Sequence, residues 1–511
     1  MTRPRPLLLG LWIAAVILVL TGVSAARAAD GVAGVTVPAE ASVGASEALL
    51  GGPPGVELRA PQDARSIRVP TGSLDTPLLT RLRSLLGLVL LVGVAWGMSV
   101  DRSKVSWRVV GWGIGLQLAF AVFILKTPVG AEVFDGLGAV VVALLGFATA
   151  GGQFLFGNLV FDTVPVGTGV VGQGGFAAIP GQVAQVGSSF AFNVLPTIIF
   201  FSALMTVLYH LGVMQVAVRG IAWVMQRTMG TSGAETLSAA GNIFVGQTEA
   251  PLLIKPFIDK MTMSELMAVM TGGFATVAGG VLAAYVGMLL AYFPDIAGHM
   301  IAASVMSAPA ALVVAKLMYP EDGTPETAGS LDFVVEKPDV NVIDAAARGS
   351  SEGLMLALNV GAMLLAFVAL IQLCNGILGW AGGFVGWDGI TLEAILGWLL
   401  APVAWLMGVS WADAPTVASL LGVKTVLNEF VAYLQLASTL SGDNTLEPRS
   451  VIIATYALSG FANFASIAMQ IGSLGGIAPA RRRDVSRLGM RAMIGGSIAA
   501  FMTATVAGMI L

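Results

Sequence analysis

The sequence predicts an all-α protein that crosses a membrane about eight times. Of its 511 residues, 56% are hydrophobic and only 11% are charged, whereas soluble domains carry about 25% charged residues. The apolar residues fall into runs close to the length of about 20 residues that a spanning helix needs. Two stretches, 241–257 and 410–439, place acids and amides inside this apolar sequence. They predict helices broken within the membrane, where exposed backbone groups must line a cavity rather than lipid.

Composition and charge exclude several classes of function. The formal net charge of −4 is small and suggests no nucleic-acid partner. The single cysteine, Cys374, excludes an intramolecular disulfide and a cysteine-based metal cluster. His210 and His299 have no second histidine or carboxylate at ligand spacing, so we interpret both as core or interfacial residues. No cofactor is expected.

The first 80 residues are expected to contribute no membrane span to the mature protein. Two arginines precede an apolar run over 7–20, and A-R-A at residues 26–28 supplies a cleavage site. This order predicts a signal peptide over residues 1–28; the alternative is an uncleaved anchor helix. Residues 29–80 are polar and rich in small residues, and we expect an exported flexible tail there.

Residues 81–212 are interpreted as N-terminal scaffold spans. The expected segments are spans over 84–100, 109–125 and 190–213, and a tilted or interfacial helix over 133–155. Three basic residues between 101 and 108 predict a cytoplasmic loop by the positive-inside rule. The G-x-G-x-x-G match at 167–172 lacks a surrounding strand–helix unit. Residues 165–187 are therefore predicted to form a glycine-rich loop without a nucleotide site.

The most polar part of the membrane region begins at Gly241 and reads G-N-I-F-V-G-Q-T-E-A-P-L-L-I-K-P-F. An ionised glutamate near the bilayer centre costs roughly 2.5–3.5 kcal/mol, so Glu249 is expected to face a cavity. Gly246 and Pro251 interrupt any helix through this stretch. A re-entrant hairpin of two half-helices over about 232–261 fits better than one kinked span.

The second half repeats the plan of the first. A second polar hairpin is expected over about 410–439, with Glu429 in the place of Glu249. G-F-A-T-V-A-G at 273–279 is similar to G-F-A-N-F-A-S at 460–466. Residues 213–511 are thus interpreted as transport-core repeats, divided by a scaffold span over about 353–377. The remaining expected spans are 263–289, 296–318, 451–475 and 493–511, with an arginine-rich cytoplasmic loop over 481–491.

Paired interrupted helices indicate a secondary transporter whose site lies between the repeats. The polar side chains there are acids, amides and hydroxyls without an arginine. This set suits a neutral solute with many hydroxyl or amide groups better than an anion. Phe461 could supply an aromatic wall for a planar base. The candidate polar residues are Asn242, Gln247, Thr248, Glu249, Thr276, Glu429, Asn463 and Ser466.

Three motifs resemble the signatures of the concentrative nucleoside transporter family. They are G-N-I-F-V-G-Q-T-E-A-P-L-L-I from Gly241, N-E-F-V-A-Y from Asn428 and S-G-F-A-N-F-A-S-I-A-M-Q-I-G from Ser459. The similarity extends from about residue 190 to 511. The resemblance implies a homotrimer in the plasma membrane (the inner membrane of a Gram-negative bacterium) that moves nucleosides by an elevator-like step. It implies no catalytic residue.

The same resemblance implies roles for individual residues. Those that would bind the nucleobase side are Gln247, Thr248 and Glu249, and those that would line the base pocket are Val281 and Phe461. Those that would hold the ribose are Glu429, Asn463 and Ser466. Those that would coordinate sodium are Asn242, Thr276 and the carbonyls of Val245 and Val277. The chain keeps the G-N-x-F-x-G-Q-T-E pattern from which proton-driven relatives tend to depart, so sodium is the expected coupling ion.

Three alternatives stay open. One is proton coupling with the same nucleoside site. A second is an intramembrane enzyme that uses Glu249 and Glu429 as an acid/base pair, although the chain has no H-E-x-x-H, G-x-S-x-G or Asp-rich metal motif. A third is a passive channel, which would neither concentrate the solute nor require an ion.

Overall fold

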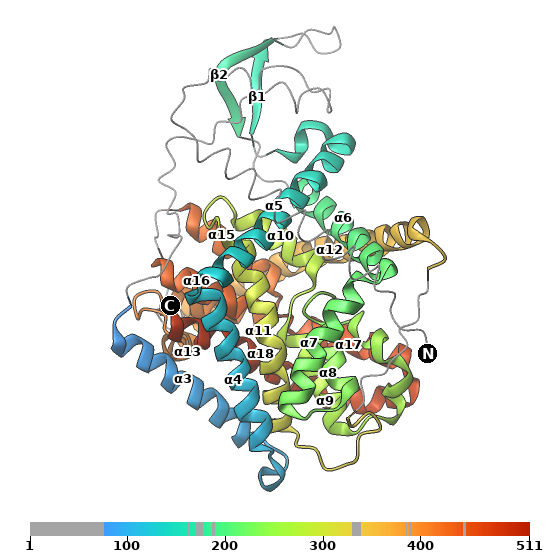
Figure 1. The fold of residues 1–511 in the computed structure, drawn as a ribbon. Helices are drawn as coiled ribbons and strands as arrows, with labels where there is room; N and C mark the ends of the chain where they lie inside the picture. Colours follow the sequence, from blue (N-terminus) through green and yellow to red (C-terminus); the bar gives the residue numbers. More distant parts are fainter. Residues whose placement is uncertain are drawn as a thin grey trace. The chain divides into compact units, whose positions relative to one another are not determined.

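The computed structural model describes residues 76–511, apart from 162, 169–176, 186–189, 330–338, 385, 388–389 and 443–445. The chain divides into two compact units, Met1–Ser66 and Ile67–Leu511, and only the second contains described residues (Figure 1). The expected signal peptide and almost all of the expected tail lie outside the described residues.

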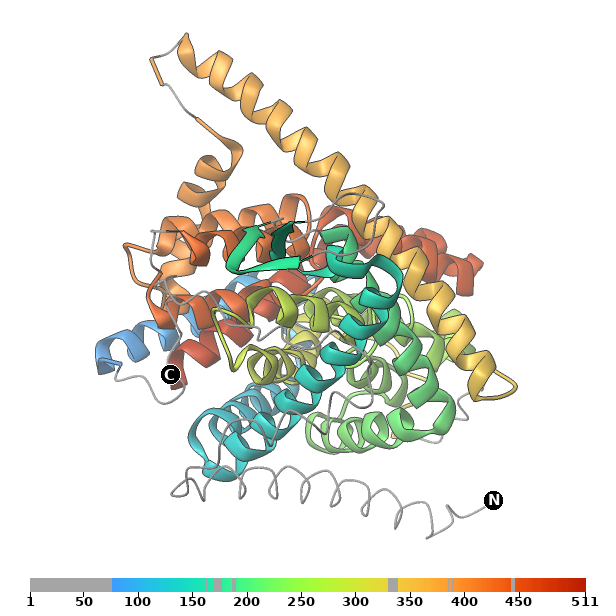
Figure 2. The ribbon, with the colours of Figure 1, turned by 90° about the horizontal axis from the view of Figure 1, so that it is seen from above.

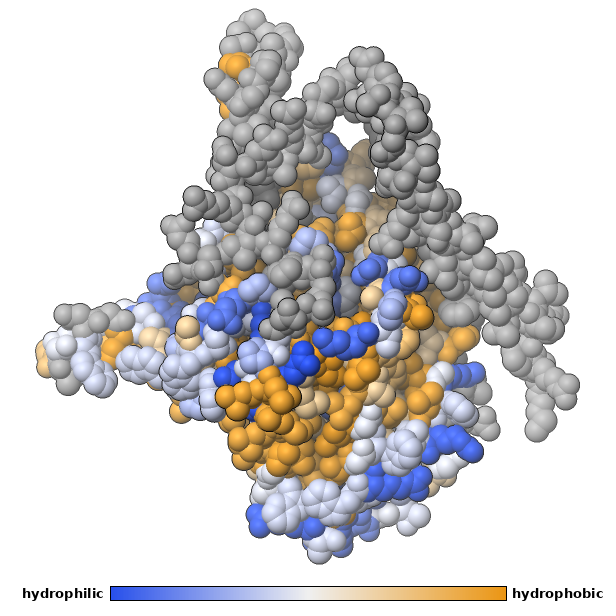
Figure 3. All heavy atoms as spheres, turned by 60° about the vertical axis from the view of Figure 1, so that its left-hand side comes forward, coloured by the Kyte–Doolittle hydropathy of each residue, from blue (hydrophilic) through white to orange (hydrophobic). Residues whose placement is uncertain are grey.

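Eight helices in the described part are long and apolar enough to cross a membrane, in agreement with the predicted all-α class. The N-terminal ones are α3 (Leu78–Gly97), α4 (Trp107–Lys126), α5 (Pro128–Phe156) and α6 (Phe190–Leu211). Many of their large apolar side chains are exposed, for example Leu79 and Phe147. Figure 3 shows a broad hydrophobic surface between hydrophilic margins, as a lipid-facing protein requires.

The predicted glycine-rich loop over 165–187 is wrong in part. Strands β1 (Thr163–Thr168) and β2 (Ala177–Gln185) form an antiparallel pair there. The strand pairing shifts register between Pro165 and Gly167, because proline has no backbone N–H to donate to the neighbouring strand. Valine and threonine favour strands, but the interspersed glycines hid this preference in the sequence.

The first repeat contains a helical hairpin followed by a broken helix. Its elements are α7 (Val213–Met229), α8 (Gly233–Gly241), η3 (Ala250–Lys260), α9 (Met263–Ala275), α10 (Gly279–Leu289) and α11 (Ile296–Met318). Capping boxes begin α8 at Ser232 and α9 at Thr262. Each box satisfies free N–H groups at a helix start, so the sequence places both starts well.

The second repeat follows the same order after a long separating helix. The separating helix is α12 (Val342–Gly383). The elements of the second repeat are α13 (Leu392–Met407), α14 (Ala414–Val426), α15 (Glu429–Ser441), α16 (Pro448–Leu458), α17 (Phe464–Ile477) and α18 (Arg482–Ile510). Short 3-10 turns are η1 (Arg102–Lys104), η2 (Gly157–Val160) and η4 (Pro479–Arg481). Because α18 begins at Arg482, most of the predicted arginine-rich loop is instead its first turns.

Two sets of helix–helix contacts position the broken helices. Helix α11 is buried along almost its whole length and packs against α9 and α18. Helix α12 runs across the molecule (Figure 2) and packs along α6. Glycine allows the close approach of α12 to α6, because a Cβ atom on Gly353 would lie 2.7 Å from Ser202 Cβ.

One end of the membrane region, called the basic end here, carries the arginine-rich first turns of α18, whereas Arg83 lies at the other end. Helix α3 joins the two ends: Arg83 donates to Val409 O near the start of α14 (2.9 Å), and Val100 N donates to Met318 O at the far end (3.1 Å). Loops at the far end are held by basic side chains, through Lys104–Asp322 (4.0 Å), Lys260–Glu326 (2.8 Å) and Arg481 Nη1 to Met261 O (2.6 Å). The α8–η3 hairpin starts from this basic end, and the α14–α15 hairpin starts from the other.

Candidate functional site

The turn of the first hairpin presses against the break between α9 and α10. Phe244 O accepts a hydrogen bond from Gly279 N (3.0 Å). A Cβ atom on Gly272 would lie 3.3 Å from Asn242 Nδ2. The turn that carries Val245 and the break that contains Thr276 and Val277 therefore lie together, and the structure assembles all four predicted sodium ligands in one place.

Asn242 is the most informative of these residues. It is 1% exposed, and neither its Oδ1 nor its Nδ2 has a hydrogen-bond partner among the described residues. A buried amide without partners costs free energy, and such a group deserves an explanation. Hard cations prefer oxygen ligands, and backbone carbonyls at a helix break are free to supply them. The donor set thus fits a sodium ion; Thr276 Oγ1 donates to Gly272 O (3.0 Å), which leaves its lone pairs available.

The second hairpin contributes a buried carboxylate. Glu429, 5% exposed, begins α15 and accepts hydrogen bonds from Tyr285 Oη at Oε1 (2.9 Å) and from Asn463 Nδ2 at Oε2 (3.0 Å). Asn463 also caps α17, because its Oδ1 accepts from Ser466 N (2.8 Å). Each oxygen of Glu429 retains acceptor capacity, so this carboxylate can still receive hydrogen bonds from a solute.

A chain of amides joins the two repeats. Gln247 Nε2 donates to Ser466 Oγ (3.0 Å), and Gln470 Nε2 donates to Gln247 Oε1 (3.0 Å) and to Met270 O (3.1 Å). All of these side chains are buried. Gln247 comes from the first hairpin, whereas Ser466 and Gln470 lie one turn apart on α17. The structure therefore brings Gln247, Glu429, Asn463 and Ser466 into one polar region, as the sequence predicts.

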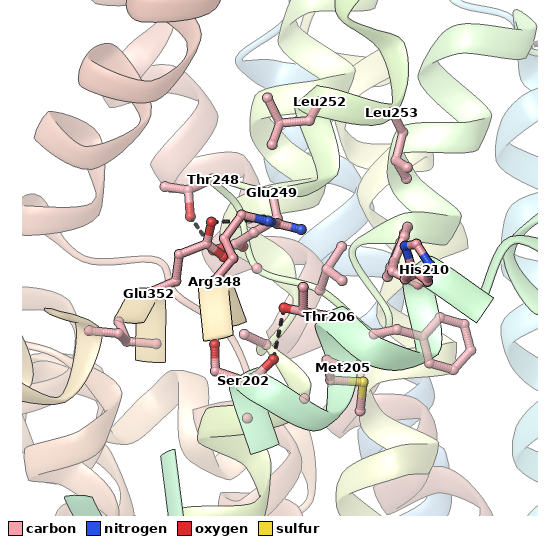
Figure 4. A pocket seen from close by; sticks show the side chains of 18 of the residues that line it. Ser202, Met205, Thr206, His210, Thr248, Glu249, Leu252, Leu253, Arg348 and Glu352 are labelled. Atoms are coloured by element: carbon pink, nitrogen blue, oxygen red, sulfur yellow. Dashed lines mark hydrogen bonds and ion pairs between the residues drawn. The ribbon is translucent and has the colours of Figure 1, made fainter. Parts of the chain in front are cut away.

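Thr248 and Glu249 face another direction. Both line a cavity of about 360 Å³ that is bounded by α6, the hairpin turn and the start of α12 (Figure 4). Thr248 Oγ1 donates to Glu249 Oε1 (2.8 Å). The expected base-binding trio is thus divided in this structure: Gln247 joins the buried network, and the other two face the cavity. Val281 and Phe461 are buried, on the first turn of α10 and in the break before α17.

Three polar residues near the site are absent from the predicted set. Tyr285 and Gln470 hydrogen-bond predicted residues directly. Both follow a predicted residue by four positions, Val281 and Ser466, so helical periodicity could have indicated them.

Lys424 is the third. It is 1% exposed, its Nζ donates to Ala457 O (2.8 Å) at the end of α16, and its charge attracts that of Glu429. Its position five residues before Glu429, within a hairpin, was the available signal.

Two hairpins and two broken helices around a buried polar centre define a polytopic membrane transporter of the repeat type. Three family models cover most of the chain: "Na+ dependent nucleoside transporter N-terminus" matches residues 86–159, "Nucleoside recognition" matches 191–292, and "Na+ dependent nucleoside transporter C-terminus" matches 299–508. The chain belongs to the concentrative nucleoside transporter family, as its three motifs predict.

Individual relatives agree with this assignment. An uncharacterized transporter of Haemophilus influenzae is 44% identical, over 84% of this chain and 98% of its own. Rat solute carrier family 28 member 3 and rat sodium/nucleoside cotransporter 1 are 42% and 41% identical over 86% of this chain, which spans 60% and 65% of their lengths. These relatives are transporters, so the chain is a transporter and not an enzyme.

Solved structures share the fold. CNTnw in an inward-facing substrate-bound state is 43% identical, with a TM-score of 0.74 over 84% of this chain and 98% of that one. A variant of CNTnw in an outward-facing state gives a TM-score of 0.76 over 85% of this chain. The chain is therefore a multi-pass membrane protein with the architecture of these transporters.

Proposed function

We propose that this protein is a sodium-coupled symporter that concentrates nucleosides into the cell. The observation that carries the proposal is the pairing of two sites across the α9–α10 break. On one side lies the buried amide of Asn242, which has no partner in the described part of the chain. On the other lies a polar network of Gln247, Glu429 and Asn463 with spare acceptors. Because the chain belongs to the concentrative nucleoside transporter family, a nucleoside is the expected solute.

The residues have distinct roles in this proposal. Glu429 accepts hydrogen bonds from the ribose hydroxyls, and its charge strengthens these bonds. The amide of Asn463 and the hydroxyl of Ser466 exchange hydrogen bonds with the same ribose hydroxyls. Gln247, Thr248 and Glu249 serve the base edge, with Val281 and Phe461 against its faces. Because Thr248 and Glu249 face the cavity here, the base side closes only when the hairpin turn rotates them toward Gln247.

Sodium would be held by Asn242, Thr276 and the carbonyls of Val245 and Val277. When bound, it supplies a positive charge that draws the hairpin turn onto the helix break. Asn242 from the turn and Thr276 from the break would share that ion, in addition to the Gly279 N–Phe244 O hydrogen bond that already joins the two segments, and the adjacent Gln247 would thereby be fixed in its network. Moving one charge across 100 mV is worth about 2.3 kcal/mol, or about 50-fold in concentration, which suffices for accumulation.

The direction of transport follows from the basic end. By the positive-inside rule, the end that carries Lys104, Lys260 and Arg481 faces the cytoplasm, and the α8–η3 hairpin opens from that side. The two hairpins and broken helices, within 213–511, form the moving part of an elevator, while 81–212 and α12 form the scaffold. The homotrimer belongs to the same proposal and rests on the family resemblance, whereas the cleaved signal peptide rests on the apolar run and the A-R-A site at residues 26–28.

Uptake of labelled uridine and adenosine into proteoliposomes tests the proposal. Sodium would be varied at fixed pH, and pH would then be varied without sodium. Accumulation that follows the sodium gradient is expected. Accumulation that follows the proton gradient would overturn the sodium assignment alone, and equilibration without accumulation would identify a passive channel.

A further inference from the structure

The cavity that Glu249 faces has a second wall to which no role has been given. This wall is formed by the first turns of α12 and the residues before it, and it includes Asp339, Arg348 and Glu352 (Figure 4). The cavity lies toward the C-terminal end of α6 and against the turn of the hairpin that starts from the basic end. A solute that leaves the polar network toward the cytoplasm therefore meets this wall.

The wall is rich in acid. Arg348 is held by Asp339 through Nε–Oδ1 (2.7 Å) and Nη2–Oδ2 (2.9 Å), and by Glu352 through Nη1–Oε1 (2.7 Å). With Glu249, three acidic side chains line the cavity together with one guanidinium. The Arg348 hydrogen bonds hold the pKa of Asp339 below its ordinary value, so this carboxylate is charged at neutral pH.

The cavity also offers neutral hydrogen-bonding groups. The hydroxyl side chains of Ser202 and Thr248 line it. These groups can serve the hydroxyls of an uncharged solute. A phosphate finds no equivalent, because the three nitrogens of Arg348 are already engaged by two carboxylates and the remaining charges repel it.

On the strength of the proposed function, we infer that this cavity is a cytoplasmic vestibule that admits nucleosides and rejects nucleoside 5′-phosphates. Asp339 and Glu352 are its specificity-determining residues, because they neutralise Arg348 and leave the cavity acidic. A nucleoside is uncharged, whereas its 5′-monophosphate carries about −1.5 to −2 at pH 7. The filter would keep phosphorylated nucleosides in the cytoplasm from occupying the released site.

The test is nucleotide inhibition of uptake by the full chain in proteoliposomes. Sodium-driven uptake of labelled uridine would be measured with uridine 5′-monophosphate on both sides of the membrane, so that either insertion orientation exposes the vestibule. The wild-type protein is expected to be insensitive. Glu352→Gln, and Asp339→Asn with Glu352→Gln, should retain uptake and become inhibited by about fivefold or more, as the loss of about 1 kcal/mol of repulsion predicts.

Three controls make the result specific. Glu326→Gln removes an acid at the same end that pairs with Lys260 outside the cavity, and it should stay insensitive. Adding Arg348→Gln to the double variant should abolish the inhibition. Inorganic phosphate in place of the nucleotide shows whether the base contributes to binding.

The outcomes separate this inference from the proposed function. Strong inhibition of the wild-type protein by the nucleotide would overturn the filter, as would insensitivity of both variants that still transport. The exposed Glu352→Gln change decides the matter if the double variant does not fold. Failure of the wild-type protein to accumulate uridine at all would instead overturn the proposed function.

Discussion

At the scale of single residues, the site depends on a few buried polar groups, some of whose partners come from the other half of the chain. Glu429 receives hydrogen bonds from Tyr285 in the first repeat and Asn463 in the second. Asn242, in contrast, has no partner among the described residues. Satisfied groups hold the fold, whereas an unsatisfied one indicates a place for a ligand.

Replacing Glu429 with glutamine should abolish uptake while the protein stays folded. The amide keeps the shape of the side chain but loses the charge, and it replaces one acceptor oxygen with a donor that opposes Asn463 Nδ2. We expect uptake to fall about 100-fold, because two charge-assisted hydrogen bonds to the solute would be lost. The measurement is uridine uptake by protein that elutes normally in gel filtration.

The matched control is Glu393→Gln. Glu393 accepts a hydrogen bond from Asn375 Nδ2 (2.9 Å) away from the polar network, so its uptake should be unchanged. Normal uptake by well-folded Glu429→Gln would refute the ribose assignment.

Replacing Asn242 with alanine should raise the sodium concentration needed for half-maximal uptake by about tenfold, the value of one lost ligand. The preference between uridine and adenosine should not change, because Asn242 lies outside the solute network. Ser238→Ala is the control, since Ser238 is one turn earlier, buried and equally without a side-chain partner. Unchanged sodium dependence in the Asn242 variant would count against this ion site.

At the scale of elements, the sequence predicts what local chemistry determines. Both hairpins follow from Glu249 and Glu429 in apolar surroundings, and the broken helices follow from repeated G-F-A motifs. The β1–β2 pair was missed because its glycines concealed the strand preference. Helix α12 begins at Val342 rather than 353, because Asn341 caps it and Arg348 pairs with Glu352 one turn later. The contacts of Tyr285 and Gln470 need the tertiary fold, which no local pattern contains.

The α6–α12 contact makes a stability prediction. In Gly353→Val the new side chain would collide with Ser202 Cβ and with Ile199 Cα, which a Cβ atom would approach to 2.7 and 2.9 Å. Overpacking of this kind costs about 1–3 kcal/mol. A lower melting temperature in detergent is expected, measured by thermal-shift fluorescence. Gly361→Ala should not lower it, since only Leu195 Cδ1 lies near, at 3.8 Å.

At the scale of the whole molecule, charge sets the orientation. The basic end holds Lys104, Lys260 and Arg481 in ion pairs and backbone contacts, and the hairpin bases alternate between the two ends. The orientation is a prediction from the positive-inside rule. The gathering of four separate loops at one end was not predictable from the sequence, because it depends on the helices that connect them.

Cysteine labelling checks this orientation. In a Cys374→Ser background, Ser486→Cys on α18 should react with an impermeant maleimide only from the cytoplasmic side. Ser441→Cys, at the end of α15, should react only from outside. Both positions are exposed. Labelling of both from the same side would contradict the alternating hairpins.

The length of α12 has a consequence for the lipid around the protein. Its 42 residues extend about 63 Å, about twice the 30 Å of a bilayer core, and Figure 2 shows the helix crossing the molecule. An upright helix of fixed length must tilt or deform the bilayer when acyl chains shorten. A tilted helix that is longer than the bilayer core can instead place a different part of its length in the hydrocarbon. The scaffold is therefore buffered against hydrophobic mismatch, and transport should tolerate membranes of different thickness.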